Sequence, residues 1–190
     1  MSSRFNQLPE VEQNLKQVQS RKRKRRQLKS WVKTILEFGS LFLLVLFVFN
    51  FILGIARVNQ NSMLPNIQPN DVIVYNRLDH NFQYNDVVVA LEVNDNVLII
   101  KRIIGLPGDT INIDDSGTLT VNGHSVQEKF LTLGQNVIRD VSFPVTLDEN
   151  EYFLIGDNRS VSLDSRSLSI GNIKKANIYG KVFYVFRGLK

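Results

Sequence analysis

The side chains that could act as a nucleophile or as a base are few in this chain of 190 residues. Cysteine is absent, which excludes a thiol nucleophile, a disulfide framework and a zinc site with Cys ligands. The two histidines, His80 and His124, lie in polar, loop-like stretches, where an exposed side chain is the ordinary expectation and a catalytic triad the rarer alternative. No HExxH, no His pair at ligand spacing and no EF-hand pattern occurs. We therefore expect no metal site and no cofactor.

A lysine can replace histidine as a general base if it is neutral near the working pH. Burial has this effect, because a low dielectric penalises the ammonium form and lowers the lysine pKa. Lys101 is the candidate, since it lies inside the apolar string Val97–Ile104. In a strand the adjacent Arg102 would point to the opposite face. Periodicity alone does not decide which of the two faces inward, and a lysine that protects a sheet edge is the alternative.

Two serines draw attention by their surroundings. Ser30-Trp31-Val32-Lys33 matches an S-x-x-K pattern, but its companions S-D-N and K-T-G are absent, so we interpret it as a chance match. Ser62 lies in Asn61-Ser62-Met63-Leu64-Pro65, just beyond a long apolar run. A small nucleophile before a turn-forming proline, close to a membrane face, suits attack on a membrane-tethered substrate. The alternative is a polar loop that leaves the membrane.

The positive charge that precedes this apolar run is confined to the N-terminus. Residues 1–34 carry a net charge of +8 and residues 35–190 a net charge of −3, which together give the total of +5. This distribution excludes a uniformly basic nucleic-acid-binding protein, and we expect no nucleic-acid partner. The run Arg21–Arg26 instead precedes an apolar segment and is typical of an orientation signal.

The apolar run extends over residues 35–56 and is long enough to cross a bilayer. Twenty-two helical residues reach about 33 Å, against a hydrocarbon core of about 30 Å. Because flanking Lys and Arg stay on the cytoplasmic side, the sequence predicts a basic cytoplasmic segment over residues 1–34 and a transmembrane anchor over residues 35–56. A cleaved signal peptide, with Gly54-Ile55-Ala56 as its cleavage site, is the alternative.

Residues 57–190 are predicted to form an extracytoplasmic, β-rich domain. Short strings rich in Val, Ile and Phe alternate with turn residues there. The predicted strands are Asp71–Tyr75, Asp86–Leu91, Val97–Ile104, Thr110–Ile113, Thr118–Val121, Val141–Leu147, Glu151–Ile155 and Ile178–Phe186. Asn122-Gly123 predicts a type I′ hairpin turn, inside a small hairpin insertion over residues 114–142.

Three motifs resemble, in order, the boxes of bacterial type I signal peptidases. They are Ser62-Met63-x-Pro65, Lys101-Arg102-x-x-Gly105-x-Pro107-Gly108-Asp109 and Gly156-Asp157-Asn158-Arg159-x-x-Ser162-x-Asp164-Ser165-Arg166. The resemblance extends from about Ile35 to Arg187 and is closest to the compact, single-span members found mostly in Gram-positive bacteria. It implies a mainly β fold of antiparallel sheets or a partly open barrel, preceded by one N-terminal transmembrane helix.

The resemblance also implies a role for each matching residue. Ser62 would be the nucleophile and Lys101 the general base of a serine endopeptidase that removes signal peptides. The supporting residues would be Ser162, which orients the lysine, the pair Asp164 and Arg166, and Asp157. Substrate pockets would be lined by Val58, Met63, Ile67, Ile99 and Ile100.

Two positions depart from the family pattern. Gln60 stands where the family has Gly or a Ser that assists the oxyanion hole, and its amide could donate there instead. Asn66 stands where the family usually has Thr or Ser. These departures are the only support for an alternative function, a non-catalytic factor that assists assembly of surface, pilus-like subunits.

The expected partners follow from the same resemblance. They are preproteins with small residues before the cut, bound extended beside an edge strand, together with the lipid bilayer; the secretion machinery is a further candidate. The expected location is the cytoplasmic membrane, with a cytoplasmic N-terminus and the catalytic domain on the outer face.

Overall fold

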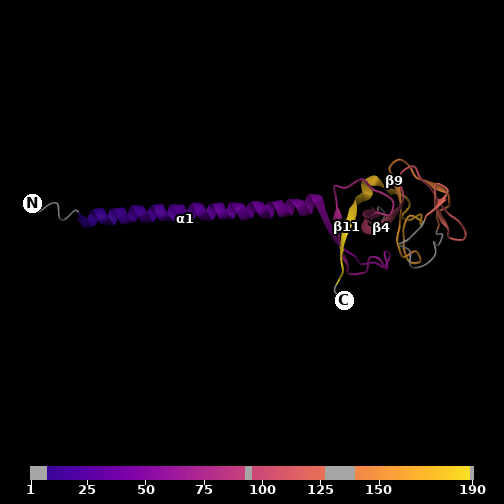
Figure 1. Ribbon diagram of the computed structural model, residues 1–190, viewed down its shortest axis with the longest axis horizontal. Coiled ribbons are helices and arrows are strands. Elements are labelled where there is room, and N and C mark those ends of the chain that lie inside the picture. Colours follow the sequence, from indigo (N-terminus) through magenta and orange to yellow (C-terminus); the bar gives the residue numbers. More distant parts are fainter. Residues whose placement is uncertain (1–7, 93–95, 127–139, 189–190) are drawn as a thin grey trace, which may run out of the picture. The chain divides into compact units, whose positions relative to one another are not determined.

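The computed structural model describes residues 8–92, 96–126 and 140–188, and side chains from residue 21 onward. The chain divides into two units, residues 1–48 and 49–190 (Figure 1). From Leu8 onward the first unit is helical, and the second contains all the strands of the described residues.

Helix α1 runs from Leu8 to Phe47 and continues as one π-helical turn, Val48–Ile52. By length and composition alone, Arg21–Ile52 could cross a membrane, and none of its most apolar window is buried. The predicted span is too long at its C-terminal end, because Leu53–Arg57 forms strand β1. These residues pair with β2, and Gly54 packs against the Tyr75 ring, where a β-carbon would find no room.

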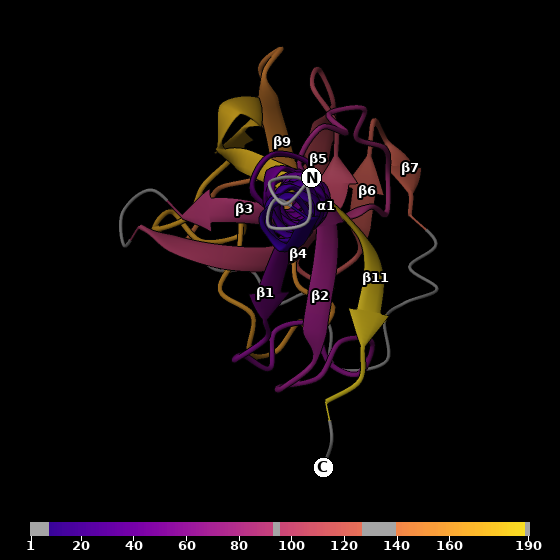
Figure 2. The ribbon, with the colours of Figure 1, turned by 90° about the vertical axis from the view of Figure 1, so that its left-hand side faces the viewer.

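The larger sheet orders its seven described strands β1-β2-β11-β3-β4-β9-β10, and every pairing is antiparallel. Its strands are β1, β2 (Val72–Asn76), β3 (Val87–Glu92), β4 (Val97–Gly105), β9 (Glu151–Ile155), β10 (Ile173–Lys174) and β11 (Ile178–Phe186). Figure 2 shows β1, β2 and β11 side by side. The C-terminal strand, β11, lies between β2 and β3, which both come from the first half of the domain.

The smaller sheet has the order β7-β6-β5-β8. Its strands are β5 (Thr110–Ile113), β6 (Leu119–Val121), β7 (His124–Ser125) and β8 (Val145–Thr146). Positive φ angles of 52° at Asn122 and 77° at Gly123 confirm the predicted hairpin turn. Residues 127–139 of the predicted insertion lie outside the described residues.

The fold prediction, antiparallel β-structure after one apolar helix, is confirmed. Seven of the eight predicted strands lie within one residue of the observed ones. The exception is Val141–Leu147, of which only Val145–Thr146 pairs with a neighbour. Strands β1, β7 and β10 are not predicted, because the first is hidden in the apolar run and the other two have only two residues each.

An apolar cluster supports the segment that carries Ser62. Val58, Met63 and Ile67 all come from the loop between β1 and β2, and all are buried. They pack with Ile73 and Tyr75 of β2 and with Val89 of β3. Three anchor points within ten residues hold this loop, here called the nucleophile loop (residues 58–71), against the large sheet.

Candidate active site

Lys101 stands on β4 opposite Val88 of β3. Only 1% of it is exposed, so the alternative of an exposed edge lysine is wrong. Burial lowers the pKa of Lys101 to about 8. Asp164 and Glu92 oppose this shift and the charge of Arg166 adds to it. A lysine with this pKa is partly neutral near pH 7 and can accept a proton.

Arg102, the next residue of β4, makes a different contact. Its Nε donates to Asp157 Oδ1 at 2.7 Å and its Nη2 to Oδ2 at 2.6 Å. The Asp157 side chain is fully buried, and the Arg102 side chain is 12% exposed. This bidentate pair ties the strand of Lys101 to the segment from Gly156 to Ser167, here called the support segment.

The support segment also holds the nucleophile loop. The backbone N–H of Asn158 donates to the carbonyl oxygen of Ser62 at 2.9 Å, and its side-chain amide donates to that of Asn61 at 3.1 Å. The Asn66 amide donates to Asp157 Oδ2 at 2.8 Å. Ser62 itself is 8% exposed. The Ser62 backbone is therefore held by contacts on both sides.

Gly156 is the point where these parts come closest together. A β-carbon there would collide with the Ser162 side chain and with the Ser62 carbonyl oxygen. Ser162 is 1% exposed, and its hydroxyl is the one buried side-chain oxygen or nitrogen among the described residues that has no hydrogen-bond partner. The hydroxyl lies near the Asp164 carboxylate and helps to lower its pKa, but at a geometry short of a hydrogen bond.

Within the part of the chain that the structure describes, no hydrogen bond joins the Ser62 hydroxyl to Lys101. Hydrogen bonds between a nucleophile and its base are often loose in a free enzyme and tighten when substrate binds. The observed link between the two is indirect. Ser62 contacts the support segment through its backbone, and Lys101 experiences the charges of Asp164 and Arg166 in the same segment.

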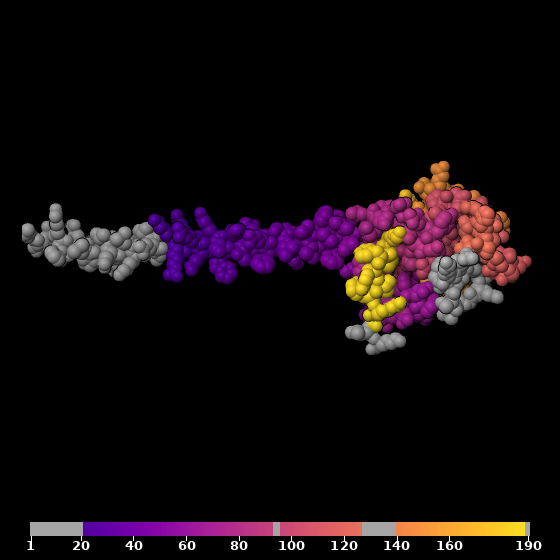
Figure 3. All heavy atoms as spheres, in the orientation of Figure 1, coloured from indigo at the N-terminus to yellow at the C-terminus, as the bar shows by residue number. Residues whose placement is uncertain are grey.

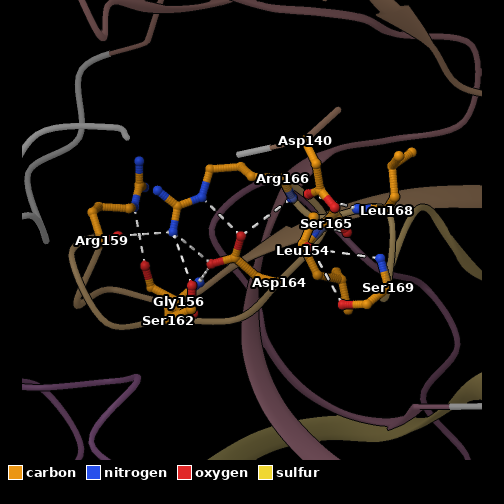
Figure 4. Close-up of polar contacts among 11 residues, drawn as sticks. Asp140, Leu154, Gly156, Arg159, Ser162, Asp164, Ser165, Arg166, Leu168 and Ser169 are labelled. Carbon is orange, nitrogen blue, oxygen red and sulfur yellow. Dashed lines mark hydrogen bonds and ion pairs between the residues drawn. The ribbon is translucent and has the colours of Figure 1, made fainter. Parts of the chain in front are cut away.

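Asp164 and Arg166 form a fully buried ion pair inside the support segment (Figure 4). Arg166 Nε and Nη2 donate to the two carboxylate oxygens of Asp164 at 2.8 and 2.9 Å. Burial alone would raise the pKa of Asp164, but the hydrogen bonds and charge of Arg166 hold it below its usual value. Asp164 also accepts the backbone N–H of Gly156 at 3.0 Å. The pair therefore fixes both ends of the turn that contains Ser162.

Three further residues of the same motif hold this turn, although the resemblance implies no role for them. Arg159 is buried; its Nε donates to the Gly156 carbonyl oxygen at 3.0 Å, and its own carbonyl accepts from Arg166 at 3.0 Å. Ser165 Oγ accepts the backbone N–H of Leu154 on β9 at 3.0 Å. The signal for Gly156, Arg159 and Ser165 was present, since all three stand in the quoted motif.

A small cavity of about 100 Å³ lies beside Ser62. Its walls come from the start of the nucleophile loop and from the first half of β4. The lining residues are Arg57, Val58, Asn59, Gln60, Ser62, Met63, Val97, Leu98, Ile99 and Ile100. Four of the five predicted pocket residues are among them. The fifth, Ile67, belongs to the apolar cluster beneath the loop instead.

The first half of β4 also has a free backbone edge beside this cavity. Val97–Lys101 pairs with β3 on one side, whereas β9 pairs with β4 only from Arg102 onward. Within the described residues no strand covers the other side of Val97–Ile100. An extended peptide could add there as a further strand.

Comparisons with known proteins point to one family. A family model described as "Signal peptidase, peptidase S26" matches residues 28–187. Signal peptidase I of Bacillus licheniformis is 33% identical over 173 residues, covering 86% of this chain and 90% of that protein. Signal peptidase I S of Bacillus subtilis (strain 168) is 32% identical over 181 residues, covering 88% and 95% respectively.

Among solved structures, a signal peptidase I of Enterococcus faecalis V583 is 29% identical, with a TM-score of 0.44, and covers 54% of this chain and 97% of that chain. The family model covers most of the sequence, and the three matching motifs all fall inside its range. This chain belongs to the signal peptidase family, peptidase S26.

Proposed function

We propose that this protein is a membrane-anchored serine endopeptidase that removes N-terminal signal peptides from exported preproteins. The observation that carries the proposal is a buried lysine with a pKa of about 8 beside the segment that also contacts Ser62, in a chain of the signal peptidase family. Ser62 is the nucleophile and Lys101 the general base.

The reaction proceeds in two steps. Neutral Lys101 takes the Ser62 hydroxyl proton as Oγ attacks the scissile carbonyl carbon, and the resulting ammonium then protonates the leaving amine. The signal peptide stays attached to Ser62 as an ester. Lys101 next takes a proton from a water molecule that attacks the ester carbonyl, and returns that proton to Ser62 Oγ as the acid product leaves.

The negative oxygen that develops in each step needs preorganised hydrogen-bond donors. One such donor lowers the activation barrier by about 2.7–4 kcal/mol in known enzymes. The backbone N–H of Ser62 is the first donor, and the side-chain amide of Gln60, on the wall of the same cavity, is the second. This assignment gives Gln60 the role that a hydroxyl or a backbone group has in relatives.

The supporting residues act on the two reacting groups. Ser162, whose buried hydroxyl has no hydrogen-bond partner among the described residues and is therefore available, orients the Lys101 amine. Asp164 and Arg166 hold the turn that carries Ser162, and Asp157 connects that turn to β4 and to the nucleophile loop. The negative charges of Asp164 and Glu92 oppose the effect of burial and limit the fall of the Lys101 pKa to about 8.

The substrate lies extended against the free edge of Val97–Ile100 and forms main-chain hydrogen bonds there. The cavity of about 100 Å³ beside Ser62 receives the side chain that precedes the cut. Val58, Met63, Ile99 and Ile100 surround this side chain. As the resemblance to signal peptidases implies, preproteins with small residues at the first and third positions before the cut are preferred.

The apolar helix anchors the enzyme in the cytoplasmic membrane. Residues 1–34 stay on the cytoplasmic side because moving their Lys and Arg across is costly. The span is the apolar stretch that begins at residue 35, and the β-rich domain lies on the outer face, where preproteins emerge from the secretion machinery. Lipid contact is confined to the anchor in this proposal.

The decisive experiment compares cleavage of a preprotein by the full-length enzyme and by Ser62→Ala and Lys101→Met. Both variants are expected to lose cleavage while keeping the wild-type circular dichroism spectrum. Ser125→Ala and Lys174→Met, at exposed positions on β7 and β10, are the matched controls and should cleave normally. Near-normal cleavage by either active-site variant would refute the proposed mechanism.

The alternative of a non-catalytic assembly factor is not favoured. A binding protein gains nothing from a buried lysine whose charge is destabilised by its surroundings. Asn66, one of the two departures from the family pattern, makes a hydrogen bond inside the site to Asp157. If the purified enzyme bound a surface subunit but cleaved no signal sequence, this alternative would replace the proposal.

A further inference from the structure

Asp71, at the end of the nucleophile loop, is a buried carboxylate outside the three family motifs. It is 2% exposed, and three donors converge on it. The backbone N–H of Gln68 and the Nη1 of Arg187 donate to Oδ2 at 2.8 and 2.7 Å, and the backbone N–H of Gly188 donates to Oδ1 at 3.0 Å. Burial by itself would raise the pKa of Asp71, but these hydrogen bonds and the Arg187 charge bring it below the usual value.

Arg187 reaches a second point of the same loop. Its Nη2 donates to the carbonyl oxygen of Asn66 at 3.0 Å. One guanidinium group thus bridges Asn66 and Asp71 through two separate nitrogens in a fixed plane, a geometry that the single nitrogen of a lysine does not reproduce. Gly188 completes the contact: a β-carbon at Gly188 would collide with the Asn70 carbonyl oxygen.

These contacts come from the C-terminal end of the described chain. Arg187 and Gly188 follow β11, which lies at the surface of the β-rich unit and is yellow in Figure 3. Because β11 pairs with β2, and β2 begins at Val72, the strand brings Arg187 to the base of the nucleophile loop. Arg187 and Gly188 therefore contact a loop that lies more than a hundred residues earlier in the sequence.

The base of the loop is firmly connected to Ser62. The backbone N–H of Val58 donates to the Asp71 carbonyl oxygen at 2.9 Å, which joins the two ends of the loop. On the other arm, the N–H of Ile67 donates to the Met63 carbonyl oxygen at 2.9 Å, next to Ser62. Asn66 is held at both its backbone, by Arg187, and its side chain, by Asp157.

We propose that Asp71 and Arg187 are positioning residues of the protease, which fix the nucleophile loop so that Ser62 points toward its general base, Lys101. The inference rests on the proposed role of Ser62 and adds a function for the C-terminal segment. Neither residue touches the lysine or lines the cavity, so they act through the backbone of the loop.

This role predicts a particular kinetic pattern. A displacement of about 1 Å at a reacting group costs up to 100-fold in rate, whereas a small shift of the loop leaves most of the β4 edge and the cavity wall intact. Arg187→Gln should therefore lower kcat by about 10-fold or more, with KM changed by less than about two-fold. The pH at which kcat/KM is half-maximal should stay the same, because Lys101 belongs to β4.

The test uses the full-length enzyme in detergent micelles with one preprotein substrate. Arg187→Gln suits it because the Arg187 side chain is 58% exposed, so its loss leaves no buried cavity. Lys181→Gln is the matched control: it removes another ion pair of β11, to Asp86, that does not contact the loop. We expect Arg187→Gln to lose kcat beyond any loss of folded protein seen in its melting curve, and Lys181→Gln to keep the wild-type kcat. Arg187→Lys should recover part of that loss through its charge on Asp71.

The outcomes separate this inference from the proposed function. If Ser62→Ala abolishes cleavage but Arg187→Gln and Asp71→Asn both cleave at the wild-type kcat, the positioning role is wrong and the protease assignment stands. If Arg187→Gln loses activity only in proportion to unfolded protein, seen in its melting curve, the contact is structural and the inference is overturned. Absence of cleavage by the wild-type enzyme would instead refute the proposed function.

Discussion

The support segment and the nucleophile loop are held in place by different means. The support segment is stabilised mainly from within: Asp164 pairs with Arg166, and Arg166 and Arg159 bind carbonyl oxygens of their own turn. The nucleophile loop has an ion pair too, but the partner of its buried Asp71 is Arg187, a largely exposed side chain outside the loop. Its other polar contacts to the rest of the domain come from Asn158 and Asp157, which are also distant in sequence.

This difference separates folding from catalysis in the site. Breaking a contact inside the support segment leaves a buried charge unpaired, so it should lower the free energy of unfolding. Breaking a contact to the nucleophile loop leaves the core intact and moves Ser62, so it should lower the rate. The predictions below test that separation.

The largest effect is expected for Arg166→Met, which leaves the Asp164 carboxylate buried without its partner. Removing one member of a buried ion pair typically costs about 3–5 kcal/mol. Urea unfolding monitored by circular dichroism would measure this loss in the free energy of unfolding. Lys181→Met is the control, since its partly exposed pair with Asp86 should contribute about 1 kcal/mol or less. Equal losses in the two variants would contradict an internally stabilised support segment.

Gly156→Ala should lower the rate as well as the stability, because the added β-carbon has no room. The added methyl group would push the Ser62 carbonyl away from the Ser162 side chain, at the contact between the two regions. A shift of about 1 Å predicts a loss of up to 100-fold in kcat. Cleavage assays on the folded variant would measure it. Gly39→Ala is the control, because a β-carbon at that position has open space. Wild-type kcat in Gly156→Ala would show that the two regions tolerate separation.

Activity should rise with pH through the pKa of Lys101, about 8. Only the neutral amine acts as a base, so kcat/KM should increase about tenfold from pH 6 to pH 7 and level off above pH 8. A pH profile of kcat/KM on a peptide substrate measures this directly. A profile that is flat from pH 6 to pH 9 would exclude Lys101 as the base.

The same pKa predicts a dependence of stability on pH. The pKa of Lys101 is lower in the folded protein than its ordinary value of 10.5, so between about pH 8 and 10.5 the unfolded chain binds more protons. The stability of the wild type should therefore rise with pH across this window, relative to Lys101→Met, by on the order of 3 kcal/mol. Parallel unfolding curves for the two proteins would contradict a buried lysine.

The smallest effect is expected for Asn66→Ala, which removes the hydrogen bond that the Asn66 amide of the nucleophile loop donates to Asp157. A hydrogen bond from a neutral donor to a charged acceptor contributes about 1.5–3 kcal/mol to stability. Arg102 continues to pair with Asp157 in this variant. We expect a loss of a few-fold in kcat. Asn66→Thr, with a hydroxyl in place of the amide, should retain more activity than Asn66→Ala. An Asn66→Thr enzyme slower than Asn66→Ala would show that the hydroxyl cannot replace the amide.

Much of the β-rich domain is predictable from the sequence because strand length and turn chemistry are local properties. The strings that contain Lys101 and Phe153 are bounded by clear turn residues, and they form β4 and β9. Strand β1 is different: its residues continue the apolar run without a break, and only their pairing with β2 distinguishes them from helix.

The candidate site divides in the same way. The motif from Gly156 to Arg166 identifies residues whose contacts lie close together in sequence, so their importance is visible without a structure. Asp71 and Arg187 are separated by more than a hundred residues and carry no local signal. Their contact depends on β11 lying beside β2, a long-range pairing that periodicity does not reveal. Likewise, periodicity leaves Lys101 and Arg102 equivalent, and only the neighbouring strands decide which is buried.

The direct passage from helix to sheet limits where this enzyme can work. The π-helical turn ends at Ile52 and β1 begins at the next residue, and Arg77 fixes the junction through the carbonyl oxygens of Ile52 and Leu53. Ten residues lead from there to Ser62, a path of at most about 35 Å even when fully stretched. With the helix anchored as proposed, that path sets a maximum height above the bilayer for any bond that can be cut. A cleavage site that lies within this distance of the bilayer, as in a preprotein held by its own apolar segment, is therefore within reach of Ser62.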